Sequence, residues 1–145
     1  MPKKNAARGG WLFKQEPDCY SYTELEIDGM TLWDGVANAL ARQNLRKVLP
    51  GDRVLYYHTG KERAIVGTMR AESGPMPDPN APDDAKAVVI KVSAAGRWEH
   101  PVTLAMIKAD ELLSQWDLVR LPRLSVVPVS PEQWRRLEEL AAKPG

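Results

Sequence analysis

Short apolar segments separated by turns that contain glycine or proline constrain the fold of this chain most strongly. WLFK (11–14) predicts a first strand, which Pro17 prevents from continuing far. Three later segments also have the length and β-branched content of strands: RVLYYH (53–58), AIVGTMRA (64–71) and AKAVVIKV (85–92). A turn containing Gly60 joins the first two of these and predicts a hairpin.

Short helices are predicted between the strands. Ser21 or Thr23 is expected to cap a first piece that Gly29 ends, and apolar residues recur at near-helical spacing within 31–49. Thr103 can cap a helix that runs through Ala109. The last helix carries the strongest signal. Ser130 is predicted to be its N-cap and Pro131 its first helical residue, and Gln133 is predicted to complete a capping box with Ser130.

The order of these elements indicates the fold class. Residues 118–129 alternate well enough for a strand broken at Pro122, and regular strand–helix–strand alternation is missing. We therefore expect an α+β fold with a small, strongly curved or closed sheet. The 145 residues suit one domain, which we place at 11–145. The polar, glycine-ended segment 1–10 predicts a disordered tail.

Charge and cysteine content limit the function classes. Twenty basic and nineteen acidic side chains nearly cancel, so a chain-wide basic field for nucleic acid is absent, and any such contact must come from a local patch or pocket. The single cysteine excludes an intramolecular disulfide. No apolar run is long enough to span a membrane. We expect a soluble cytoplasmic monomer.

Several kinds of site have no sequence signature here. The chain contains neither a glycine-rich phosphate loop nor a dinucleotide fingerprint. His58, His100 and Cys19 are isolated from one another, whereas zinc sites need clustered ligands at set spacing. The sequence therefore predicts neither a metal nor a cofactor.

Polar and aromatic residues combine at four places. Each place taken alone also fits a solvated edge or core packing, so only the combination points to a site. The four segments are Lys14-Gln15-Glu16-Pro17, Trp33-Asp34-Gly35, Tyr56-Tyr57-His58 and Arg123-Leu124-Ser125.

This combination resembles the EVE domain, a member of the PUA-like superfamily. The resemblance runs in order from Trp11 to about Leu137 and rests on long, unusual segments. They are WLFKQEPDCYSYTEL, WDGVAN with ARQNLR, PGDRVLYYHTG, IVG, MPDP, PVTLAMIKAD and LVRLPRLSVVPVSPEQW.

The resemblance implies a PUA-like fold, a small curved β-barrel flanked by short helices. It also implies a non-catalytic module that recognises a modified nucleobase in DNA or RNA, with modified cytosine in DNA among the ligands proposed for the family. The family's pocket falls on matching positions of this chain: Gln15, Glu16, Trp33, Asn38, Arg42, Asn44, Tyr57, His58, Arg123 and Ser125.

The chain departs from the family pattern around this expected pocket. A serine or threonine is usual where Gln15 stands, and an aromatic residue is usual at Met76. Tyr-Gln is common at Ala39-Leu40, and Gln-Ser at Leu121-Pro122. These differences affect the ligand carried over from the family and leave the fold assignment untouched.

The chemistry of base recognition makes Trp33 the central candidate. A base methyl group adds apolar area, so its recognition needs a flat wall together with a few fixed donors and acceptors. We expect one face of the Trp33 ring to line a partly open pocket, with Gln15 and a side chain from 38–44 within reach. On this view Trp33→Ala leaves the fold intact. Arg42, Arg46 and Lys47 are candidates for flanking phosphates.

The sequence is also compatible with two other functions. Similar PUA-like proteins of the ASCH group include hydrolases of acylated nucleosides that use a lysine and a carboxylate. Lys14 and Glu16 are the candidates here, although no nearby hydroxyl completes the pair. The other alternative is a protein-interaction domain with a decayed pocket.

Overall fold

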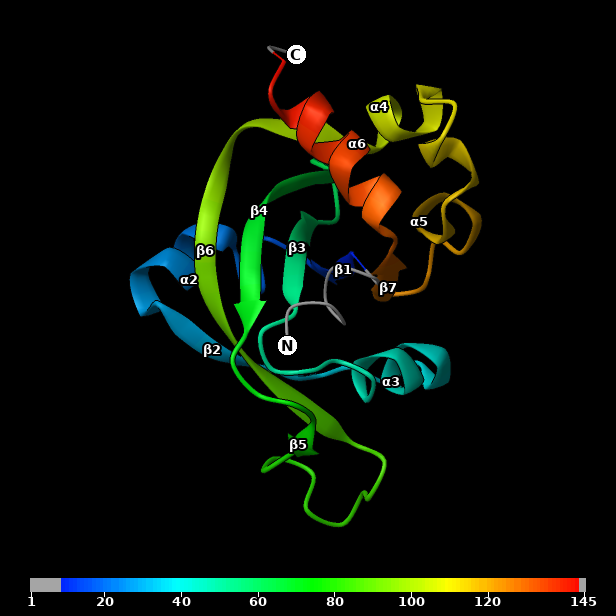
Figure 1. Cartoon of the computed structure of the whole chain (residues 1–145). Coiled ribbons are helices and arrows are strands. Elements are labelled where there is room, and N and C mark those ends of the chain that lie inside the picture. Colours follow the sequence, from blue (N-terminus) through cyan, green and yellow to red (C-terminus); the bar gives the residue numbers. More distant parts are fainter. Residues whose placement is uncertain (1–8, 144–145) are drawn as a thin grey trace.

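One mixed sheet forms the centre of the molecule. The computed structural model describes residues 9–143. The sheet has seven strands in the order β2-β6-β4-β3-β1-β7, with β5 paired to β6 beside this path (Figure 1). β1 and β3 are parallel, and the other pairs are antiparallel. The strands are β1 (Gly10–Gln15), β2 (Met30–Trp33), β3 (Arg53–His58), β4 (Ala64–Ala71), β5 (Met76–Pro77), β6 (Val88–Thr103) and β7 (Val126–Val129).

Short helices connect and flank the strands. They are α2 (Tyr22–Asp28), α3 (Ala39–Leu45), α4 (Leu104–Ala109), the 3-10 turn η1 (Leu113–Gln115), α5 (Asp117–Arg120) and α6 (Pro131–Ala141). Ser21, Thr103 and Ser130 each form a capping box. The box was predicted at Ser130, a cap was predicted at Thr103, and the structure selects Ser21 over Thr23 as the cap of α2. Gly29 ends α2 with φ 77°, a backbone conformation that favours glycine.

Strong curvature brings the two ends of the sheet path towards each other without closing it. Strand β2 lies four places from β1 in the sheet order, yet the ring centroids of Trp33 and Phe13 are 5.3 Å apart. The rings meet across the concave side, where Tyr56 and Tyr22 join them. No pairing joins β2 to β7 among the described residues. The sheet is therefore curved and open, so of the two expected forms, a strongly curved or a closed sheet, the structure has the curved one.

Two segments differ from their predicted structures. Residues 117–120 form helix α5, so the strand predicted over 118–129 is limited to β7. Within 31–49, the helix starts only at Ala39, because the Asn38 side chain accepts the Ala41 N–H and caps it there. In residues 117–120, the alternation of apolar residues did not distinguish a single helical turn from a strand, because Leu118 would be buried in either conformation.

The described chain begins within the sheet. Gly10 opens β1, so the folded region starts before residue 11. A side chain at Gly10 would collide with the carbonyl oxygen of Arg53. Of the tail predicted for residues 1–10, residues 1–8 lie outside the described residues. Within 9–143, no helix has both the length and the apolar character needed to cross a membrane.

Candidate functional site

A pocket of about 300 Å³ lies where the end of β1 faces β2 across the concave side. It is called the Trp33 pocket here. Its walls come from the end of β1, the turn that follows and the end of β2, so they depend on the curvature of the sheet. The lining residues are Gln15, Cys19, Tyr20, Thr31, Leu32, Trp33 and Asp34.

Trp33 is both a wall of this pocket and part of the core. Its side chain lines the pocket, but the residue is only 4% exposed. One ring contact is with Phe13, and the other is an edge-to-face contact with Tyr56 at 5.2 Å. Packing of this kind holds the indole in one orientation. It also removes the basis for expecting that Trp33→Ala would leave the fold intact with a smaller stability loss than the truncation of a buried tryptophan.

Gln15 brings an amide to the same pocket. Its Oε1 accepts the backbone N–H of Glu16 at 2.9 Å, and its amide nitrogen has no hydrogen-bond partner among residues 9–143. That nitrogen can donate to a ligand. Glu16 is exposed, and its carboxylate accepts from the thiol of Cys19 at 3.8 Å. Gln15 and Trp33 therefore share the pocket as the sequence placed them, with Glu16 beside it.

The sequence missed the polar rim formed by Tyr20 and Thr31. The Tyr20 hydroxyl donates to Asp28 at 2.7 Å. Burial, together with this bond, raises the pKa of Tyr20 to about 12, so the phenol stays protonated at neutral pH. Thr31 precedes Trp33 by two positions in β2, and that spacing puts both side chains on one face of a strand. This alternation was the available signal for Thr31. Tyr20 lies in a turn and had none.

Asn38 and Arg123 line a different pocket, of about 280 Å³. Leu40, Leu121 and Pro122 line it too, so three of the departures from the family pattern gather at one place. It is called the Asn38 pocket here. The helix that begins after Asn38 contributes no lining residue to the Trp33 pocket, which corrects the expected contact from 38–44.

Two predicted site residues on α3 have structural partners. Arg42 Nε donates to the Val36 carbonyl at 2.7 Å, and its Nη1 lies 3.3 Å from the Asp84 carboxylate. Asn44 is buried, and its Nδ2 donates to the Val126 carbonyl of β7 at 2.8 Å. These bonds attach α3 to its neighbours and point away from a ligand role.

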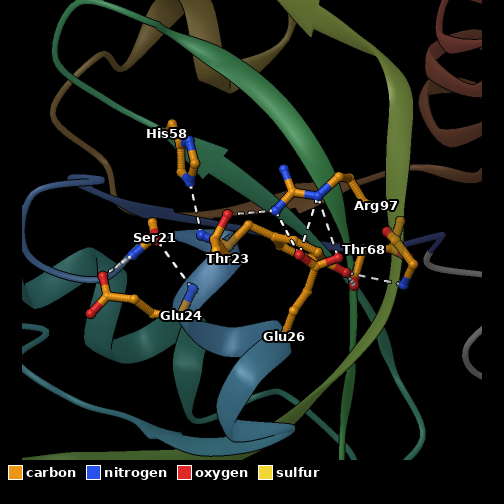
Figure 2. A network of polar contacts seen from close by, with 9 residues as sticks. Ser21, Thr23, Glu24, Glu26, His58, Thr68 and Arg97 are labelled. Atoms are coloured by element: carbon orange, nitrogen blue, oxygen red, sulfur yellow. Dashed lines mark hydrogen bonds and ion pairs between the residues drawn. The ribbon is translucent and has the colours of Figure 1, made fainter.

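His58 also holds the fold together. Its Nε2 accepts the backbone N–H of Tyr22 at 3.1 Å, at the first residue of α2 (Figure 2). Its Nδ1 lies 2.7 Å from Glu62 Oε1. Both ring nitrogens are thus engaged within the protein, and the imidazole is absent from the lining of the Trp33 pocket.

The adjacent residues Lys14 and Gln15 line pockets on opposite faces of β1. Lys14 pairs in register with Tyr57 of β3, and both line a pocket of about 290 Å³, called the Lys14 pocket. Lys14 Nζ donates to the Pro122 carbonyl at 2.8 Å, and burial lowers the pKa of this ammonium group. The Ser125 carbonyl accepts from Lys14 N at 3.0 Å, so Ser125 acts through its backbone.

The described residues show no cluster suited to a metal. Within 9–143, no group of three or more His, Cys, Asp or Glu side chains is arranged to hold an ion.

Comparison with known proteins identifies the family. The EVE domain family model matches residues 10–140. The chain belongs to the EVE domain family. It is 31% identical over 139 residues to the uncharacterized protein C21.03c of Schizosaccharomyces pombe, covering 83% of this chain and 58% of that protein. It is 34% identical over 80 residues to human thymocyte nuclear protein 1, covering 47% of this chain and 36% of the relative. The chain therefore spans between about a third and three fifths of the length of these two proteins.

Solved structures support the same EVE assignment. The crystal structure of human THYN1 protein in complex with 5-methylcytosine containing DNA has a TM-score of 0.87 and 25% identity, covering 94% of this chain and 99% of that one. An ASCH protein from Zymomonas mobilis has a TM-score of 0.58 and 11% identity, covering 92% of this chain and 96% of that one. The second likeness concerns the fold alone.

Proposed function

We propose that this EVE domain binds a modified nucleobase in nucleic acid and holds the base in the Trp33 pocket, with 5-methylcytosine in DNA as the first candidate. One observation carries the proposal. A single pocket of about 300 Å³ combines the fixed indole of Trp33, the amide of Gln15 and the side chain of Thr31. A flat apolar wall with a few donors and acceptors suits a methylated base.

The relative bound to DNA supports this choice of ligand class. Human THYN1 was crystallised with DNA that contains 5-methylcytosine, and its fold matches nearly the whole chain. Stacking on an aromatic ring contributes about 1–3 kcal/mol per base. A base taken from a duplex must first be flipped, which costs a few kcal/mol. Because these terms nearly balance, we expect modest affinity and a preference for bases that are already unpaired.

The proposal assigns different roles to the ten residues expected from the sequence. Gln15 and Trp33 contact the base, and Glu16 lies at the rim. Asn38 and Arg123 border the separate Asn38 pocket, where flanking nucleotides are proposed to pass. The remaining members support the fold or the opposite face of the sheet: Arg42, Asn44, Tyr57, His58 and Ser125.

We propose binding without turnover. Lys14 and Glu16, the candidate hydrolase pair, are engaged with different partners. The lysine donates to the Pro122 carbonyl, and the carboxylate accepts from Cys19. Incubation of the protein with acylated and methylated nucleosides should leave them unchanged by mass spectrometry. Conversion of any of them would favour the hydrolase function.

The proposed function is tested with matched oligonucleotides. Fluorescence anisotropy at fixed salt compares single strands that differ by one 5-methyl group, and the modified strand should bind more tightly. Gln15→Leu should reduce this preference because it removes the amide from the pocket. Gln115→Leu makes the same change in a pocket at the start of β1 and should preserve the preference. Equal affinity of the natural chain for modified and unmodified strands, across a panel of modified bases, would contradict the proposal.

A further inference from the structure

The Lys14 pocket is cationic and contains no carboxylate. Lys14, Arg63 and Lys108 line it together with Tyr57, Thr59, Gly60 and three apolar residues. Among the described residues, none of these three cations forms an ion pair with a carboxylate. The chain as a whole is almost neutral, with a formal charge of +1, so a cluster of three unpaired cations is a local feature. A concave site of this composition attracts anions.

Lys14 is the cation of this pocket whose side chain the fold holds in place. Lys14 is half-buried, and its ammonium is directed by the bond to the Pro122 carbonyl. That bond uses one of three donors and leaves the others available. Burial lowers the pKa of Lys14, and an anion bound beside it would offset this cost of desolvation.

The turn that carries Arg63 is also fixed. Arg63 has φ 44°, the only positive φ of a non-glycine residue in the described part of the chain. Its carbonyl accepts the N–H of Leu104 at 2.8 Å, which ties the turn to the start of α4. Such backbone strain persists where the surroundings over-determine it, and it occurs often at ligand sites. Glu62 belongs to the same turn but contacts His58 and does not line the pocket.

The Lys14 and Trp33 pockets lie on opposite faces of β1, and both have lining residues at the carboxyl ends of β1 and β3 or in the turns that follow. Thr59 N donates to the Gln15 carbonyl at 3.0 Å, and these two residues line the Lys14 and Trp33 pockets, respectively. One backbone hydrogen bond thus connects a lining residue of each pocket. A nucleic-acid strand with a base in the Trp33 pocket can then pass the end of β1 and place a phosphate in the Lys14 pocket.

The α3 cations are less available. Arg42 is bonded to Val36 and paired with Asp84, and Arg46 Nη1 donates to the Lys86 carbonyl at 3.3 Å. The phosphate contacts expected on this helix therefore have competing partners within the protein.

We propose that the Lys14 pocket binds a backbone phosphate of the strand whose modified base enters the Trp33 pocket, through Lys14, Arg63 and Lys108. The placement next to a base rests on the proposed function. The affinity of the pocket for phosphate does not, since it depends on charge alone and is independent of the modification.

The test compares two double variants with the same change in charge. Arg63→Gln/Lys108→Gln removes two exposed cations of the pocket. Lys91→Gln/Arg135→Gln removes two exposed cations on β6 and α6 that form no ion pair among the described residues. Each full-length variant is titrated with modified and unmodified single strands over a salt series. A 5′-mononucleotide is titrated separately and followed through the amide signals of Thr59 and Gly60.

The expected result is a weaker and less salt-dependent complex for the pocket variant alone. Affinity should fall about fivefold at low salt. The slope of log K against log salt should decrease by about 0.7, because the pocket contacts one phosphate and each lost phosphate contact on a single strand accounts for about 0.7. The decrease should be the same on modified and unmodified strands. The same decrease is therefore expected even if the natural chain does not prefer the modified base.

Two results would overturn the inference in different ways. If only the mononucleotide loses binding, the site holds a free phosphorylated small molecule and its assignment to a strand is wrong. If the pocket variant matches the control variant with both probes, the pocket does not bind phosphate.

Discussion

The indole of Trp33 meets the ring of Tyr56 edge to face, with centroids 5.2 Å apart and planes at 87°. One ring thus forms the wall of the candidate pocket and a part of the core. Because the core holds the indole, a base that stacks on it does not have to order it first, which lowers the cost of binding. The same contact links pocket mutations to stability.

Replacement of Trp33 should therefore destabilise the protein. Trp33→Ala should lower the free energy of unfolding by about 3–5 kcal/mol, as for a buried aromatic residue, and Trp33→Phe should lose less. Urea denaturation followed by circular dichroism measures both. Trp98→Ala, at a half-buried position on β6, is the matched control and should cost less. A loss below about 1 kcal/mol for Trp33→Ala would show that the ring is not part of the core.

Asn44 should affect stability and leave binding unchanged. Asn44→Ala leaves the buried Val126 carbonyl without its side-chain donor and should cost about 1–3 kcal/mol. Gln43→Ala, at the exposed neighbouring position, should change stability by less than about 0.5 kcal/mol. Affinity for the modified strand is measured at a temperature where all variants are folded. If Asn44→Ala lost affinity for the modified strand and kept its full stability, Asn44 would be a residue of the binding site.

The pair of Asp110 and Arg136 should make stability depend on pH. Arg136 Nε donates to Asp110 at 2.7 Å, and the Leu113 N–H donates to the same carboxylate. Burial alone would raise the pKa of Asp110, but these bonds outweigh it and hold the pKa below its usual value. The carboxylate therefore stabilises the fold above about pH 4, and this contribution is lost as pH falls through the lowered pKa.

Melting temperatures of the natural chain and Asp110→Asn test this dependence. The variant should melt several degrees lower at pH 7, and the gap should narrow below about pH 4. Asp83→Asn, at an exposed position, should show no gap at either pH. A gap that persists unchanged in acid would contradict the expected role of the ionised carboxylate.

Gly67 should not tolerate a side chain. A Cβ at this position would lie 2.7 Å from the Tyr22 ring and 2.8 Å from the Gly96 carbonyl oxygen. Tyr22 cannot easily retreat, because its hydroxyl donates to Thr68 O and accepts from Gly96 N. Gly67→Ala should cost about 1–3 kcal/mol by urea denaturation. Gly74→Ala, where the nearest atoms are 3.8 Å away, is the control, and an equal effect at both positions would refute the steric argument.

Local chemistry made the starts of α2, α4 and α6 predictable. Ser21, Thr103 and Ser130 each bond to a residue three positions away, so the information lies within four consecutive letters. The β3–β4 hairpin is local in the same way. Helix α5 was missed because four residues carry too little periodicity to separate a helical turn from a strand.

The position of Trp33 and Gln15 on one pocket was predicted through the resemblance to the EVE domain. Amides, aromatic rings and arginines are equally suited to ligands and to internal partners, so residue type alone did not separate the two roles. Arg42, Asn44 and His58 have the chemistry of site residues but are bonded to Val36, Val126 and Tyr22. Those partners are set by packing between elements.

The sequence by itself determined the capped helices, the hairpin and the EVE family, because these depend on neighbouring residues or on motifs in a fixed order. Only the tertiary structure decided that the sheet stays open, that Trp33 is both core and wall, and that Lys14 and Gln15 line separate pockets. The physical reason is the curvature of the sheet. The curvature is the accumulated twist of all the strand pairings between β1 and β2. It brings β2 close to β1, and the 14 residues between Gln15 and Met30 do not determine this contact by themselves.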